Sequence, residues 1–129
     1  MSLKRLPLPH FQIGASSVYI ETESDPLSKR FMFAYKIEIK NLGMEFAQLV
    51  SRHWIITDAF GHTEEIKGPG VVGLQPKITP NQTFQYESAC PLTTSTGTMR
   101  GFYSFLSHTG EPFNVEIPEF YLVSPHSVH

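Results

Sequence analysis

The sequence predicts an all-β fold, an antiparallel sandwich or barrel built from about seven short strands. Three observations support this prediction. Apolar residues recur at every second position in several segments, turn-forming residues separate these segments, and no ten-residue stretch has the 3.6-residue period and caps of a helix. With 129 residues, 40% of them hydrophobic and 17% charged, the chain is long enough to bury a core as one domain over residues 1–129.

The first three expected strands lie in the N-terminal half. Residues 16–22 carry Val18 and Ile20 as apolar positions. Residues 47–59 are β-branched and aromatic on both faces, as a central strand would be. Residues 30–41 show the clearest alternation, which is typical of a half-buried strand, and their apolar face consists of Phe31, Phe33, Tyr35, Ile37 and Ile39.

Three more strands are expected towards the C-terminus, at residues 83–89, 97–108 and 112–123. Pro118 interrupts the last of them, and because proline cannot donate to a strand ladder, it predicts a bulge or a sheet edge there. Residues that favour turns lie between the segments. The apolar positions of the three strands are Phe84, Tyr86, Met99, Tyr103, Phe105, Phe113, Val115 and Ile117.

The composition excludes several classes of partner. A formal net charge of −2 gives no basic field of the kind that attracts nucleic acid, and no apolar run approaches the roughly eighteen residues of a membrane span. Cys90 is the only cysteine, so no disulfide can form within the chain and a cytoplasmic protein is expected. Residues 1–11 are expected to be a flexible N-terminal segment, since prolines interrupt what would be the apolar region of a signal peptide.

No constellation of catalytic or metal-binding residues is visible in the sequence. The histidines form no H-x-H, H-E-x-x-H or Cys/His ligand pair, so no metal site and no cofactor are expected. Asp58, His62 and Glu64 cluster at one turn, which is expected to be a solvated hairpin loop rather than a weak divalent-ion site. Cys90 is expected to be a buried, inert thiol, and no G-x-S-x-G elbow occurs. We therefore expect a protein that is not an enzyme.

Gly68, Gly70 and Gly73 are spaced as G-x-G-x-x-G, the fingerprint of a dinucleotide-binding turn. Such a turn needs a helix directly after the third glycine, because the helix N-terminus holds the pyrophosphate. Here the segment LQPKITP follows, and its two prolines exclude a helix. We therefore expect a glycine-rich crossing between strands. The alternative is a small-anion nest of loop amides, helped by Lys67 and Arg52.

Arg52 lies in the segment that is expected to be a central strand. If Trp54 and Ile56 face the core, strict alternation places Arg52 on the same face, beside Val50. A guanidinium in that place must reach solvent at the end of the sheet, pair with a carboxylate, or bind an anion. An ordinary ion pair and an anion ligand near the glycine loop are therefore both open interpretations of Arg52.

Phe102 and Leu106 lie on the opposite face of their strand from its core positions. Only one face of each sheet is covered in a two-layer sandwich, so these side chains are exposed unless another segment packs on them. One interpretation is packing under a loop or the N-terminal segment. The other is a candidate interaction surface for a protein partner or for a second copy of the chain in a homodimer.

Seven blocks of the chain together resemble the ApaG (CorD) family. They are FAYKIEIKNLG, RHWIIT, GPGVVGLQP, FQYES, GTMRGFYSF, FNVEIPEFYL and VSPHSVH, in matching order and spacing, and the resemblance covers residues 13–129. It implies an immunoglobulin- or fibronectin-III-like antiparallel β-sandwich of about seven or eight strands. It also implies an association with magnesium and cobalt homeostasis in bacteria. Similar eukaryotic domains imply a role in protein interaction, but such associations are not mechanisms.

Two functional hypotheses follow from these observations. The favoured one is a non-enzymatic interaction module, a rigid sandwich that presents loops and an apolar strip to a protein partner. The alternative is a binding protein for a small anion, a nucleotide or pyrophosphate, or an enzyme that acts on one, with the glycine loop as its site. Neither hypothesis involves nucleic acid or a membrane.

Overall fold

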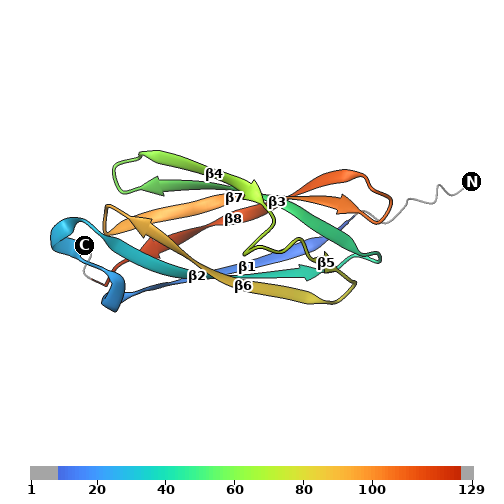
Figure 1. Ribbon diagram of the computed structural model, residues 1–129, viewed down its shortest axis with the longest axis horizontal. Helices are drawn as coiled ribbons and strands as arrows, with labels where there is room; N and C mark the ends of the chain where they lie inside the picture. Colours follow the sequence, from blue (N-terminus) through green and yellow to red (C-terminus); the bar gives the residue numbers. More distant parts are fainter. Residues whose placement is uncertain (1–8, 126–129) are drawn as a thin grey trace, which may run out of the picture.

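The computed structural model describes residues 9–125 and confirms the predicted all-β sandwich (Figure 1). One sheet has the strand order β1-β2-β6, and the other has the order β4-β3-β7-β8, with β5 paired to β3 next to β4. All the strand pairs of this part of the chain are antiparallel. Its strands are β1 (Phe11–Tyr19), β2 (Phe31–Asn41), β3 (Ala47–Asp58), β4 (Thr63–Pro69), β5 (Lys77–Ile78), β6 (Thr83–Leu92), β7 (Thr96–Ser107) and β8 (Pro112–Val123).

Two short 3-10 turns, η1 (Glu21–Glu23) and η2 (Pro26–Ser28), connect β1 to β2. Within residues 9–125, no helix is long and apolar enough to cross a membrane. The N-terminal segment at 1–11, expected to be flexible, lies mainly outside the described residues. Its last residue, Phe11, begins β1 and pairs with Asn41.

The core lies between the inner faces of the two sheets, and β2 contributes its whole predicted apolar face. Phe33, Ile37 and Ile39 are fully buried, and the other two residues of that face are at most 9% exposed. Trp54 of β3 is 2% exposed, and its ring packs edge-on against Tyr35 with the centroids 5.5 Å apart. The alternation of apolar residues thus predicted which face of β2 is buried.

β1 differs from the sequence expectation. Val18, one of the two apolar residues that suggested this strand, points outward and is 67% exposed. Tyr19 points inward instead and packs against Phe33, with the ring centroids 5.4 Å apart. The pairing of β1 with β2 fixes this phase, because Tyr19 lies opposite Phe33 in the register and a one-residue shift would reverse every side chain of the strand.

Pro118 lies where the pairing of β7 with β8 is irregular. The register shifts between Met99 and Gly101, since Met99 pairs with Phe120 and Gly101 with Ile117. β8 is also an edge strand of its sheet. Both features expected of a strand proline, a bulge and an edge position, are therefore present.

A second bulge changes the alternation along β3. The register between β3 and β7 shifts between Leu49 and Ser51, so Val50 is the extra residue. Leu49 is fully buried, whereas the inward positions beyond the bulge are even-numbered. The strict alternation that placed Val50 beside Arg52 is therefore interrupted at Val50.

The two sides of the sandwich are closed differently. On one side β1 approaches β8, and the Ser17 hydroxyl donates a hydrogen bond to the Tyr121 carbonyl oxygen at 2.7 Å. On the other side the edge strands of the two sheets are β6 and β4. The crossing from β4 to β6, residues 70–82, contains β5 and two of the three fingerprint glycines.

Gly101 is expected to be essential for pairing β3 with β7. A methyl group at this position would overlap the His53 carbonyl oxygen of the neighbouring strand. Gly101→Ala should therefore lower the free energy of unfolding by more than about 3 kcal/mol in urea titrations. Gly14→Ala is the matched control, because its methyl group would meet nothing closer than Glu38 at 3.8 Å. A loss of stability as large in the control as in Gly101→Ala would contradict this explanation.

Candidate functional site

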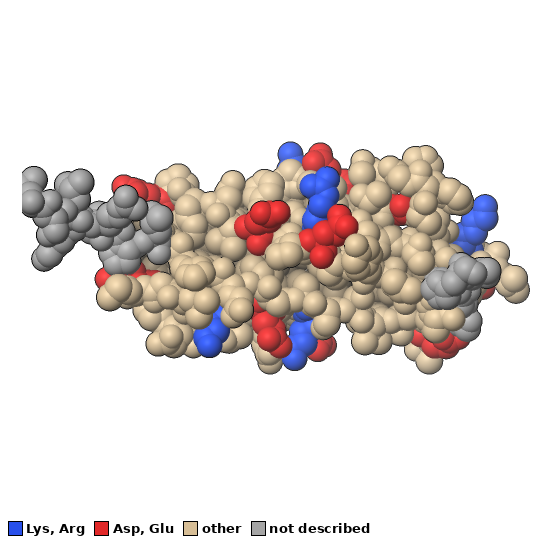
Figure 2. All heavy atoms as spheres, turned by 180° about the vertical axis from the view of Figure 1, so that it is seen from behind, with Lys and Arg blue, Asp and Glu red and all other residues tan. Residues whose placement is uncertain are grey.

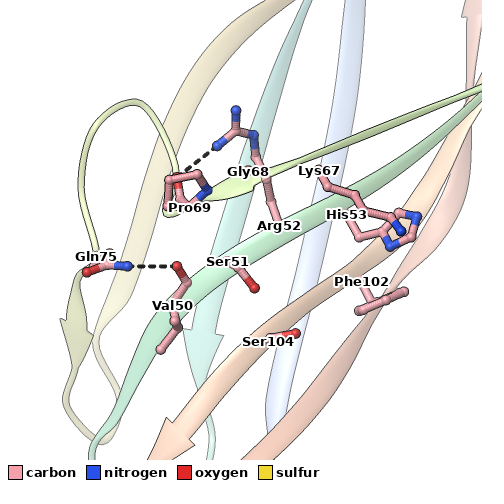
Figure 3. Close-up of a pocket in the computed structure, with 10 residues that line it drawn as sticks. All are labelled: Val50, Ser51, Arg52, His53, Lys67, Gly68, Pro69, Gln75, Phe102 and Ser104. Atoms are coloured by element: carbon pink, nitrogen blue, oxygen red, sulfur yellow. Dashed lines mark hydrogen bonds between the residues drawn. The ribbon is translucent and has the colours of Figure 1, made fainter.

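Arg52 lies on the inner strand β3, and backbone carbonyl groups at the end of β4 hold its side chain. It lies opposite Gly68 in the pairing of β3 with β4. Its Nη1 donates a hydrogen bond of 2.9 Å to the carbonyl oxygen of Pro69 (Figure 3) and one of 3.0 Å to the carbonyl oxygen of Gly70. A methyl group on Gly68 would lie 2.9 Å from Nη2 and 3.1 Å from Cζ, so this glycine leaves space for the guanidinium.

The rest of the glycine motif forms a tight hairpin. The amide and carbonyl groups of Val71 and Leu74 exchange hydrogen bonds of 2.8 and 2.9 Å. Between them, Val72 and Gly73 have φ values of 43° and 80°, the positive values that a type I′ turn requires at both central positions. Gly70 has a φ of 58°, and a side chain there would overlap the Leu74 carbonyl oxygen. The motif therefore forms the strand crossing that the prolines predicted.

The hydrogen bonds of this crossing bear on the anion-nest alternative. The Gly70 amide donates to the Val50 carbonyl oxygen at 2.7 Å, and the amides of Val71 and Leu74 donate to each other's carbonyl oxygens. Nη1 of Arg52 is bonded to loop carbonyl oxygens as well. Three amides of the crossing and Nη1 of Arg52 are thus already bonded to backbone carbonyl oxygens, which favours the structural interpretation.

A shallow recess of about 480 Å³, here called the outer hollow, lies on the outer face of the five-stranded sheet. It brings three of the five candidate loop residues together, but it does not include Gly70 or Gly73. Figure 3 shows how β3, β4 and β7 supply its lining. The lining residues are Val50, Ser51, Arg52, His53, Lys67, Gly68, Pro69, Gln75, Phe102 and Ser104.

The two residues of the candidate interaction surface occupy different parts of this outer face. Phe102 is half-buried, lines the outer hollow and packs on His53, with the ring centroids 4.8 Å apart. The Nε2 atom of His53 lies 3.2 Å from Oε1 of Glu65. Leu106 is 37% exposed and lies farther along β7, outside the outer hollow. Phe102 alone of the pair therefore belongs to the recess.

The surface carries charges of both signs. On the face seen in Figure 2, lysine, arginine, aspartate and glutamate side chains are interspersed over a largely uncharged surface. The formal net charge of the chain is −2. This face offers no continuous basic area of the kind that binds a phosphate backbone.

The turn at Asp58 uses its carboxylate for local hydrogen bonds. Oδ1 accepts hydrogen bonds from the amides of Phe60 at 2.9 Å and His62 at 3.0 Å. Desolvation raises the pKa of Asp58, but these two hydrogen bonds and the nearby His62 outweigh it and lower that pKa below its usual value. Across residues 9–125, no group of three or more His, Cys, Asp and Glu side chains could hold a metal ion.

The core contains polar groups that the sequence pattern did not single out. The hydroxyl groups of Tyr86 and Tyr103 share a hydrogen bond of 2.5 Å between the sheets. Cys90 is a free, buried thiol, as expected, and burial raises its pKa to about 11. Alternation predicted that Tyr86 and Tyr103 face inward. It could not show which polar atoms meet, because that depends on how the two sheets face each other.

Two substitutions in the glycine crossing are expected to change stability in opposite directions. Gly70→Ala should lower the melting temperature, because alanine would adopt a positive φ and overlap the Leu74 carbonyl oxygen. Val72→Asn should raise it by a few degrees, because a β-branched residue is strained at a φ of 43° and asparagine tolerates this conformation. Thermal unfolding measures both effects.

Isothermal titration with ATP, NAD and pyrophosphate should show no binding tighter than about 1 mM. Micromolar binding that Gly70→Ala abolishes without a change in melting would overturn this interpretation.

Stability is expected to fall as the pH rises above about 9. Burial raises the pKa of Cys90 from 9.0 to about 11, and burial also raises the pKa values of Tyr35, Tyr86 and Tyr103 above 10.0. The folded chain therefore keeps protons that the unfolded chain has already released. The contribution of these groups to the free energy of unfolding is complete below pH 9. It is lost as the pH rises through the pKa values of the folded state, by up to about 1.4 kcal/mol per pH unit for each proton. Urea titrations from pH 7 to 10.5 test the trend, and Cys90→Ala should delay its onset. Stability that stays constant over this range would refute it.

Comparisons of the sequence and the fold with known proteins identify the family of this chain. Residues 21–107 match the family model described as the ApaG domain. The chain is 58% identical to Protein ApaG of Bdellovibrio bacteriovorus over 98% of its own length and all of that protein, and 44% identical to Protein ApaG of Bordetella pertussis over the full length of both. A crystal structure of a Bordetella pertussis protein described as ApaA superposes with a TM-score of 0.89 at 44% identity, covering 92% of this chain and 97% of that one. The chain therefore belongs to the ApaG family.

Proposed function

We propose that this chain is a non-enzymatic binding module that docks a segment of a partner protein in the outer hollow. The observation that carries the proposal is an apolar recess on a sheet face that no other described segment covers. Phe102, Val50 and Pro69 supply apolar surface there. Recesses of this kind, with an aromatic floor and a polar rim, are where interfaces concentrate their binding free energy.

The rim of the outer hollow indicates the chemistry of the partner segment. Lys67 lies opposite His53 in the pairing of β3 with β4, and both line the recess beside Arg52. Lys67 makes no ion pair with the rest of residues 9–125, whereas His53 is paired with Glu65. An apolar side chain that enters the recess next to a carboxylate would complement both the floor and the free ammonium group.

The edge of β4 offers a second means of contact. β4 pairs with β3 along one edge, and no strand within residues 9–125 pairs with its other edge. An extended partner segment could add to this edge through backbone hydrogen bonds while its side chains reach the outer hollow. Pro69 removes one donor and ends the strand, so such pairing would involve only the part of β4 before it.

The resemblance implies an association with magnesium and cobalt homeostasis. Under this proposal, the protein would influence these ions through its partner. The same proposal places the protein in the cytoplasm, where its single thiol, Cys90, would remain reduced. A second copy of the chain is an alternative occupant of the outer hollow, and the experiment below distinguishes it by mass.

A photo-crosslinking amino acid at position 67 should capture one protein partner from a cell lysate. The same group at position 18, on the exposed outer face of the other sheet, is the control. Phe102→Ala and Lys67→Glu should each reduce recovery of the partner at least about tenfold in pull-downs, because they remove the apolar floor or reverse the rim charge.

The mass of the cross-linked product identifies the occupant. A product of twice the chain's own mass would show a homodimer and exclude the partner-segment proposal. Equal cross-linking from positions 67 and 18, or recovery that Phe102→Ala leaves unchanged, would also exclude it. Melting temperatures of the variants confirm that each remains folded.

A further inference from the structure

A cleft between the two sheets, here called the inter-sheet cleft, lies on the side where β4 and β6 are the edge strands. Its volume is about 250 Å³, and it is more enclosed than the outer hollow. Both sheets contribute to its lining, which includes Tyr35, Arg52, Trp54, Glu64, Ile66 and Ser88. None of the site residues expected from the sequence, apart from Arg52, belongs to it.

Trp54 brings an unsatisfied hydrogen-bond donor to this region. Its side chain is buried, with 2% exposure, and its Nε1 atom has no hydrogen-bond partner within residues 9–125. Nearly all buried polar groups in native proteins are hydrogen-bonded, so a buried indole N–H without a partner calls for an explanation. Because this atom is closed to solvent, Trp54 serves here as a reporter in the wall of the inter-sheet cleft and not as a contact for a ligand.

Arg52 adds a positive charge whose position is already fixed. Its Nη1 is bonded to the carbonyl oxygens of Pro69 and Gly70, whereas Nε and Nη2 make no hydrogen bond within residues 9–125. The guanidinium lies against Gly68 of β4. Burial, the largest effect, raises the pKa of Tyr35, and the side chain of Ser88 and the charge of Arg52 lower it by less. Tyr35 is therefore a neutral hydroxyl at neutral pH, and it already interacts with the side chain of Ser88.

The remaining walls of the inter-sheet cleft are mostly apolar. Ile66 lies opposite Trp54, and Ile56 and Met99 face the same space from the five-stranded sheet. Glu64 lies opposite Ile56 in the register, four residues from Gly68, and it is exposed. The cleft thus has a cation and hydrogen-bond donors at one end, an apolar middle, and a carboxylate at the other end.

We propose that the inter-sheet cleft binds a small organic monocarboxylate with an apolar body. The carboxylate accepts hydrogen bonds from the unbonded N–H groups of Arg52, and the body packs between Ile66 and Met99. A cavity of about 150 Å³ can hold a benzene ring, so about 250 Å³ accommodates a ring with a carboxylate. Glu64 disfavours a second negative charge at the far end. This site is separate from the outer hollow, although Arg52 lines both recesses.

The single tryptophan gives the experiment a direct reporter. In a ¹⁵N-labelled sample, the one indole N–H resonance belongs to Trp54. Benzoate should shift this resonance saturably, with a dissociation constant of about 1 mM or below. Benzamide, which has nearly the same shape without the charge, should bind at least about tenfold more weakly. Terephthalate, with its second carboxylate, should also bind at least about tenfold more weakly, and Glu64→Gln should reduce that difference.

Two variants of β4 test the location without disturbing the hydrogen bonds of Arg52. Ile66→Asp places a negative charge in the wall opposite Trp54 and should weaken benzoate binding at least about tenfold. Lys67→Gln changes the net charge by the same amount on the neighbouring residue, which lines the outer hollow instead, and should change binding less than about twofold.

Three outcomes would overturn the proposal. The first is an indole resonance that benzoate leaves unchanged. The second is equal binding of benzoate and benzamide, which would show that the charge of Arg52 is not recognised. The third is equal weakening by Ile66→Asp and Lys67→Gln, which would indicate a general charge effect. None of these outcomes bears on cross-linking from position 67, so failure here and failure of the partner-segment proposal are distinguishable.

Discussion

The bond between the Arg52 guanidinium and the two carbonyl oxygens after β4 organises the side of the sandwich that carries both recesses. Without it, the half-buried guanidinium would lose both of its hydrogen-bond partners, and the crossing from β4 to β6 would lose one of its several ties to β3. Gly68 makes the bond geometrically accessible, because any side chain there would occupy the space of the guanidinium. One charged side chain thus explains the first glycine of the motif.

The other two glycines follow from the turn that this tie requires. The chain must leave β4, insert Val71 fully into the core and return to pair as β5 with β3. A two-residue turn with positive φ at both central positions achieves that reversal, and Gly70 and Gly73 provide conformations that other residues adopt at a cost. The spacing resembles a dinucleotide fingerprint, and here close backbone approach and positive φ account for all three glycines.

The sequence predicted the fold class and most of the strands, because a half-buried antiparallel strand alternates apolar and polar residues and this period is visible in the sequence. It also identified Trp54 and Cys90 as buried and the glycine motif as a crossing. It did not identify β5, since two residues are too short to show any period. The outward position of Val18 was equally hidden, because the register with β2, and not the character of one residue, decides the face of β1.

The inter-sheet cleft is a further feature that periodicity could not reveal. Alternation places Tyr35, Arg52 and Trp54 on inner faces, but their meeting depends on which edge strands leave a gap between the sheets. A single local irregularity, the bulge at Val50, also shifts the phase of β3 just before Arg52. Site geometry in a sandwich is therefore a property of the packing of two sheets, whereas strand identity is a property of one segment.

Arg52 lines both the outer hollow and the inter-sheet cleft, and this shared position has a physical consequence. Its Nη1 bonds hold the guanidinium in one place, so a ligand in either recess meets a cation that needs no further ordering, and the entropic cost of binding is reduced. The remaining N–H groups cannot serve two anions equally, since each anion would weaken the field available to the other. Occupancy of one recess by a negatively charged group therefore opposes anion binding in the other, and the geometry couples the two recesses through a single side chain.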